Sequence, residues 1–145
     1  MSKVIYKYEN KVVIKRNRSE VLDLFLDYER FHEWQPTLTK VVLKEGKFKE
    51  AGHLVFLFYE GEDGTITVMN ESIENISLPH KVINTYQVGT VFNRQYNYFE
   101  SYGADTMWVV ETEFHFEEEP PANEMAFQRT TRKALTRFKR FVESN

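Results

Sequence analysis

A long amphipathic helix near the end of the sequence constrains the fold more than any other feature. Within residues 123–142, apolar and small residues recur at helical spacing and share one face: Phe127, Thr131, Ala134, Leu135, Phe138, Phe141 and Val142. Basic residues occupy the rest of this segment, mostly towards its end, where cations complement the helix dipole. A single helix with one buried face needs a large apolar partner, which the preceding residues must provide.

Strand-like runs separated by turn signals precede this helix. They are rich in β-branched and aromatic residues, and their short connections predict antiparallel hairpins. The expected strands cover residues 3–16, 38–44, 54–59, 65–76, 81–88, 92–102 and 106–116. Two short helices follow the first strand: one begins at the capping residues 17–20, and the other spans 29–34 and ends before Pro36. The sequence therefore predicts an α+β domain with a seven-stranded antiparallel sheet.

Three short motifs accompany this order of elements. Val21–Asp27 is followed by Trp34-Gln35-Pro36, Leu78–Val82 enters the fifth strand, and Gly103–Thr106 enters the seventh. Together they resemble the helix-grip fold of the SRPBCC superfamily, which includes START lipid-transfer domains, pollen-allergen-like proteins and polyketide cyclases. One departure is that Ala104-Asp105 replaces the glycine pair usual before the threonine. The resemblance implies one domain over residues 1–145, with a curved sheet gripping the last helix and a cavity between them.

Composition limits the classes of function. The twelve Phe, eight Tyr and two Trp need either a core or a ligand to cover them. A net charge of −3 does not favour nucleic acid, and no apolar run is long enough for a membrane span or a signal peptide. The chain has no cysteine, which fits a reducing compartment, and we expect a cytoplasmic protein. The basic helix face is expected to be solvated rather than bound to a membrane, because the apolar stripe is needed by the sheet.

Strand alternation suggests which side chains line the cavity. Trp108 and Thr112 are expected to face inward, as are Asn84 and Tyr86. On strand 91–102, hydrophobicity favours the face with Arg94 and Tyr96, whereas the family-like spacing of Phe99 favours the opposite face. Arg94 is either an inward anchor for an anion or carbonyl, or an outward partner in a salt bridge. The full predicted ligand-binding set is Phe25, Trp34, Phe56, Phe58, Asn84, Tyr86, Arg94, Tyr96, Trp108, Thr112, Phe127, Thr131 and Phe138.

No motif assigns a reaction. The four histidines lack metal-ligand spacing, and no nucleophile elbow or phosphate loop is present, so we expect no metal, cofactor or catalytic residue. The preferred hypothesis is binding of a small hydrophobic molecule, aromatic or lipid-like. A second is a cyclase- or hydratase-type enzyme, which requires an inward titratable group among Arg94, Tyr96, Tyr98, Glu71 and His32. A third is a protein-interaction module that resembles the chaperone-activating members of the superfamily; its partner is not identified by the sequence.

Overall fold

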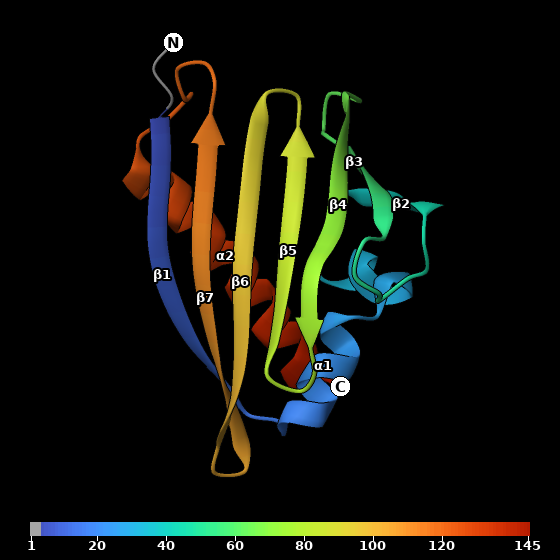
Figure 1. The fold of residues 1–145 in the computed structure, drawn as a ribbon, viewed down its shortest axis with the longest axis vertical. Coiled ribbons are helices and arrows are strands. Elements are labelled where there is room, and N and C mark those ends of the chain that lie inside the picture. The colour runs from blue at the N-terminus through green and yellow to red at the C-terminus, as the bar shows by residue number, and fades with distance from the viewer. Residues whose placement is uncertain (1–3) are drawn as a thin grey trace.

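The computed structural model describes residues 4–145, which form one curved antiparallel sheet and a long helix across its concave face (Figure 1). The strands are β1 (Val4–Ile14), β2 (Leu38–Glu45), β3 (Leu54–Glu60), β4 (Ile66–Ser77), β5 (Lys81–Val88), β6 (Val91–Tyr102) and β7 (Asp105–Phe116). The helices are α1 (Arg18–Phe25), the 3-10 helix η1 (Tyr28–Glu33) and α2 (Glu124–Glu143). The sheet order β1-β7-β6-β5-β4-β3-β2 confirms the predicted helix-grip architecture. Residue 3, the predicted start of the first strand, lies outside the described residues.

Side-chain caps set where both α-helices begin. The Asn17 side chain accepts a hydrogen bond from the Glu20 N–H at 3.0 Å, and Asn123 does the same for Ala126 at 2.9 Å. Each cap satisfies a backbone donor that the first helical turn leaves free. No helix within residues 4–145 is both long and apolar enough to cross a membrane.

An aromatic cluster fills the space between the sheet and the C-terminal half of α2. Phe138 is fully buried, and its ring centroid lies 5.1 Å from both Trp34 and Trp108 and 5.7 Å from Phe25. The edge-to-face geometry of these pairs adds to the stabilisation from burial. A second cluster, built by η1 against β3, contains Tyr28, Phe31, Leu38, Val55 and Leu57.

Polar contacts hold α2 against β1, at one edge of the sheet. Tyr8 and Thr131 share a hydrogen bond of 2.8 Å, Arg132 donates to Asn10 at 3.1 Å, and Lys139 donates to the Val13 carbonyl at 2.8 Å. The helix therefore lies against the β1 side, while η1 and the turn after it cover part of the opposite half of the sheet.

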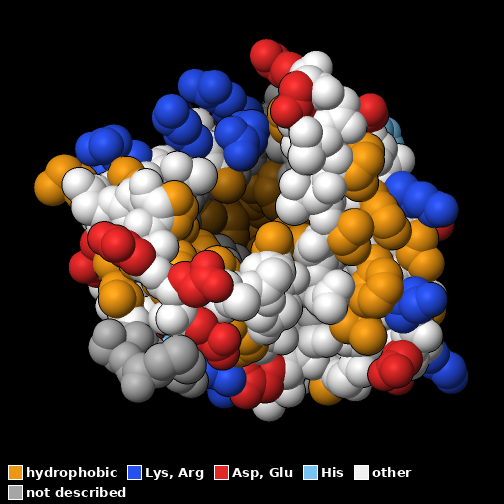
Figure 2. Space-filling view, turned by 90° about the horizontal axis from the view of Figure 1, so that it is seen from above, with side chains coloured by type: hydrophobic (Ala, Val, Ile, Leu, Met, Phe, Trp, Pro, Cys, Tyr) orange, Lys and Arg blue, Asp and Glu red, His pale blue; other side chains and the backbone are white. Residues whose placement is uncertain are grey.

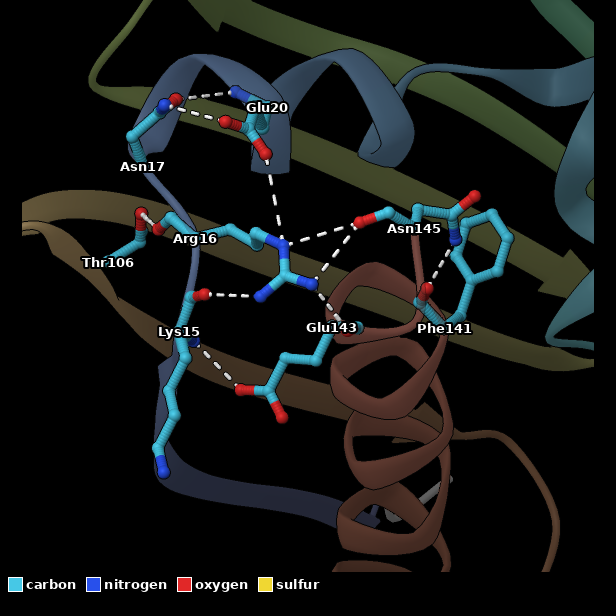
Figure 3. Close-up of polar contacts among 8 residues, drawn as sticks. All are labelled: Lys15, Arg16, Asn17, Glu20, Thr106, Phe141, Glu143 and Asn145. Atoms are coloured by element: carbon cyan, nitrogen blue, oxygen red, sulfur yellow. Dashed lines mark hydrogen bonds and ion pairs between the residues drawn. The ribbon is translucent and has the colours of Figure 1, made fainter.

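Arg16 ties the loop after β1 to the end of α2 (Figure 3). Its guanidinium group donates to the backbone carbonyls of Glu143 and Asn145, and the Glu143 carboxylate accepts the Lys15 N–H at 2.8 Å. A cation at this position satisfies carbonyls that the last helical turn leaves free and complements the helix dipole.

Strand pairing settles which face of β6 points inward. Phe99 pairs with Trp108 and stacks on it, with a centroid distance of 6.2 Å and an interplanar angle of 6°. Asn97 and Phe99 are therefore buried on the concave face, and Arg94 and Tyr96 lie on the convex face. The family-like spacing of Phe99 gave the correct face, and the choice favoured by hydrophobicity was wrong.

A β-bulge explains why no inward face of β4 could be read from the sequence. The register of β4 against β5 shifts between Ile73 and Asn75. Glu71 and Ile73 are buried before the shift, whereas Ile76 packs against the core after it. One extra residue reverses the alternation, so neither the odd-numbered nor the even-numbered residues of β4 are apolar along the whole strand.

Candidate functional site

A pocket of about 390 Å³ lies between the sheet and the middle of α2. Aromatic and aliphatic side chains form most of its wall: Phe25, Phe31, Trp34, Leu57, Tyr59, Met69, Tyr86, Trp108 and Leu135. Polar side chains from the central strands complete it, and Gln35, Pro36, Thr37 and Arg137 also border it. Figure 2 shows a deep hollow lined by hydrophobic side chains, with Lys and Arg side chains gathered along one side of its rim.

Glu71 is the most deeply buried charged group of the pocket, with 1% of its surface exposed. Its Oε1 accepts hydrogen bonds from the Tyr28 hydroxyl at 2.6 Å and from the Asn84 amide at 3.0 Å. Its Oε2 lies 2.8 Å from Nε2 of His53, which is itself completely buried. Side chains from three separate segments therefore converge on one buried carboxylate.

The position of the His53 proton follows from the other side of the ring. The backbone N–H of Lys49 donates to Nδ1 at 3.2 Å, so Nδ1 acts as an acceptor. The proton of the neutral ring is therefore on Nε2, from which it is donated to Glu71. His53 and Glu71 form a pair, and no cluster of three or more His, Asp or Glu side chains suited to a metal ion occurs within residues 4–145.

A chain of hydrogen bonds crosses the sheet and ends at Glu71. The Trp108 indole N–H donates to Oδ1 of Asn97 at 3.1 Å, and the Asn97 amide donates to Oδ1 of Asn84 at 3.1 Å. The Asn84 amide then donates to Glu71. All three donors point the same way, so the dipoles of the chain stabilise a negative charge at its end.

Several polar groups of the pocket have no hydrogen-bond partner among the described residues, and three of them bear on the choice of ligand. Nε1 of Trp34 and Oδ1 of Asn93 are buried and unpaired, and the Tyr86 hydroxyl forms no hydrogen bond with residues 4–145. Burial, followed by the charge of Glu71, raises the pKa of the Tyr86 phenol well above its ordinary value. Tyr86 therefore stays protonated and can donate or accept one hydrogen bond.

The structure brings five of the predicted ligand-binding residues into the pocket lining: Phe25, Trp34, Asn84, Tyr86 and Trp108. Four others, Thr112, Phe127, Thr131 and Phe138, lie between the sheet and α2 but outside this lining. Phe127 packs with Phe114 and Phe116 near the start of α2, and Phe138 belongs to the core.

The remaining four predicted residues lie on the convex face, which corrects their assignment. Phe56 and Phe58 alternate with Val55 and Leu57, which pack beneath η1, so both phenyl rings point outward. The Lys44 ammonium group lies 5.5 Å from the centroid of the Phe56 ring, and the Lys40 ammonium group lies 5.7 Å from the centroid of the Phe58 ring. Arg94 forms a salt bridge of 2.6 Å with Glu74, and the Tyr96 hydroxyl donates to Glu113 at 3.4 Å.

The network around Glu71 was not predicted from the sequence. The pattern indicates Glu71 only as one possible titratable group, and it does not single out Tyr28 or His53. His53 precedes β3, and the pairing of β3 with β4, which places Val55 opposite Glu71, brings these two regions together. A histidine next to an apolar strand was the one available signal, and it does not identify its partner.

A larger and more open groove of about 880 Å³ lies on the outer side of η1, next to β2. Its lining includes Asp23, Asp27, Glu29 and the exposed His32. Charged side chains in open solvent interact weakly because water screens them. The pocket beneath α2, with its aromatic wall and buried polar groups, is therefore the better candidate for a specific binding site.

Solved structures of low sequence identity share this fold. Ara h 8.0201 aligns with a TM-score of 0.83 at 13% identity, over 98% of this chain and 100% of that protein. An aromatase/cyclase from a Streptomyces species aligns with a TM-score of 0.75 at 13% identity, over 97% of this chain and 94% of the enzyme. A START superfamily protein from Mycobacterium smegmatis aligns with a TM-score of 0.74 at 12% identity, over 96% and 98% of the two chains.

These likenesses establish the class of fold: the chain shares the helix-grip fold of these solved structures. No protein-family model and no curated protein sequence matches the chain. Function must therefore be argued from the pocket.

Proposed function

We propose that this protein binds a small, largely apolar molecule in the pocket beneath α2. The observation that supports this most directly is an aromatic wall combined with buried polar groups that lack partners. Trp34 Nε1 and Asn93 Oδ1 are such groups. Leaving a polar atom buried and unpaired is unfavourable, and a bound molecule with complementary groups removes that cost.

The size and chemistry of the pocket fit an aromatic molecule with one or a few polar groups. Its volume of about 390 Å³ is within the range of roughly 300–1,000 Å³ found for small-molecule sites. The rings of Trp34, Tyr59 and Tyr86 offer flat surfaces for stacking. The shared fold with an aromatase/cyclase adds support for a small-molecule function.

A neutral fluorescent probe tests this proposal. N-phenylnaphthylamine should bind with increased emission, because its rings leave water for an apolar pocket. Ala134 lines the pocket on α2, so Ala134→Phe should fill the space and abolish the signal. The matched control is Thr136→Phe, at an exposed position of the same helix, which should bind like the wild type.

Native mass spectrometry of the purified protein provides a second readout. A co-purified molecule should appear as added mass on the wild type and on Thr136→Phe, and be absent from Ala134→Phe. Equal probe binding by all three proteins would place the binding site elsewhere and reject the pocket.

Proton transfer is a second candidate function, favoured by the buried Glu71 in the pocket wall. A carboxylate next to an apolar pocket can remove an activated C–H proton from a bound ketone and return it. Exchange of the acidic protons of β-tetralone in heavy water, followed by NMR, tests this reaction. The exchange rate should exceed that of buffer and fall to it in Glu71→Gln. An exchange rate equal to that of buffer with the wild-type protein would reject the enzymatic function.

A further inference from the structure

We infer that the pocket recognises a molecule with a protonated nitrogen, which lies against the carboxylate of Glu71. This inference rests on the proposed binding function and specifies its ligand as an arylalkyl amine or a related organic cation. Its basis is a buried carboxylate whose hydrogen-bond partners within residues 4–145 are all neutral.

The surroundings of Glu71 contain no counter-charge. Tyr28 and Asn84 are neutral donors, and the Lys49 N–H on Nδ1 fixes His53 as the neutral tautomer. Apart from His53, no basic side chain in the described part of the chain lies within ion-pair distance of Glu71. A buried charge is unfavourable unless it is paired, so a cation delivered by a ligand gains more here than at an exposed carboxylate.

The hydrogen bonds of Glu71 leave room for another donor. Oε1 accepts from Tyr28 and Asn84, whereas Oε2 has His53 as its one partner among the described residues. A carboxylate oxygen has two acceptor positions, so Oε2 retains one. The buried Oδ1 of Asn93 and the hydroxyl of Tyr86 add two more acceptors to the same pocket. An ammonium group, with up to three donors, matches this set.

The aromatic wall favours the same class of ligand. Trp34, Tyr59 and Tyr86 line the pocket, and the face of an aromatic ring attracts a cation that has lost its water. The charge of Glu71 also acts across this space: after burial, it is the next cause that raises the pKa of both Tyr59 and Tyr86. A cationic group in the pocket is therefore attracted both by the carboxylate of Glu71 and by the faces of the aromatic rings.

Arg137 provides the competing possibility. It borders the pocket from α2 but is exposed, and its positive charge would favour an anion at the entrance. An anion moving inward from Arg137 would approach the charge of Glu71 and be repelled. The relative affinity of matched cationic, neutral and anionic ligands therefore decides between the two groups.

Isothermal titration calorimetry with naphthylethylamine, naphthylethanol and naphthylpropionate makes this comparison, because the three share one ring system. We expect the amine to bind about tenfold more tightly than the alcohol. The carboxylate should bind most weakly. In Glu71→Gln, the amine and the alcohol should bind with similar affinity. The control Glu74→Gln, on the convex face of the same strand, should keep the wild-type order.

If Glu71→Gln does not fold, the order of the three ligand affinities in the wild-type protein still tests the inference. If naphthylpropionate binds most tightly of the three, the inference is overturned, and Arg137 rather than Glu71 selects the ligand. An advantage of the amine that persists in folded Glu71→Gln would also overturn the inference. If N-phenylnaphthylamine binds but naphthylethylamine has no advantage over the alcohol, the preference for a cation is rejected and the binding pocket is retained. If neither the dye nor any of the three ligands binds, the proposed binding function itself is rejected.

Discussion

The two faces of the sheet carry similar residue types in different surroundings. On β4, Glu71 points to the concave face and is bonded to neutral groups, whereas Glu74 points outward and pairs with Arg94 at 2.6 Å. The phenyl ring of Phe138 is fully buried against the concave face, whereas Phe58 lies on the convex face near Lys40. The comparison shows that the partners, and not the residue type, determine what each side chain contributes.

Truncating a buried ring and an outward ring should separate the two faces most clearly. Phe138→Ala should lower the free energy of unfolding by about 3–5 kcal/mol, because a cavity replaces the centre of the aromatic cluster. Phe58→Ala, its match on the convex face, should lower it by no more than about 1 kcal/mol. Urea denaturation followed by circular dichroism measures both. Equal losses would show that the convex face also contributes a packed core.

Removing the two carboxylates of β4 gives a smaller contrast. Glu71→Ala should cost about 2–3 kcal/mol of unfolding free energy, because Tyr28, His53 and Asn84 lose a buried acceptor. Glu74→Ala should cost less than about 1 kcal/mol, since a partly exposed ion pair contributes little. The same denaturation experiment checks both values. A larger loss for Glu74→Ala would contradict the assignment of the faces.

The tyrosines provide the smallest contrast, visible at alkaline pH. Burial, and then the charge of Glu71, raises the pKa of Tyr86, so the folded protein keeps a proton that the unfolded chain releases. The free energy of unfolding should therefore fall as the pH rises above about 10.

Tyr86→Phe should flatten this fall in stability. Tyr98→Phe should flatten it less, because the convex Tyr98 is less buried and its pKa is raised to a smaller extent. Denaturation curves recorded from neutral to alkaline pH test both variants. An unchanged slope in Tyr86→Phe would argue against burial of its phenol.

The fold was predictable because its signals are local and repeated. Turn residues separate the strands, and the spacing of Phe138, Phe141 and Val142 identifies the buried face of α2. On β5 and β7, unbroken alternation placed Asn84 and Trp108 on the concave face, where both are buried.

The candidate site was only partly predictable, because its central contacts join distant segments. Tyr28 meets Glu71 through the docking of η1 on β3, and the bulge after Ile73 conceals the inward face of β4. Phe56 and Phe58 were predicted to line the pocket, but both faces of β3 are apolar, so alternation alone does not identify its inward face. The docking of η1 decides between these faces, and no pattern within β3 records it.

The hydrogen bonds that run from Trp108 through Asn97 and Asn84 to Glu71 give the protein a built-in optical reporter. Because every amide in the series is oriented alike, a change of charge at the carboxylate alters the electric field at the indole ring. The wavelength of maximum fluorescence emission of Trp108 should therefore shift when the pocket is occupied, without any added label.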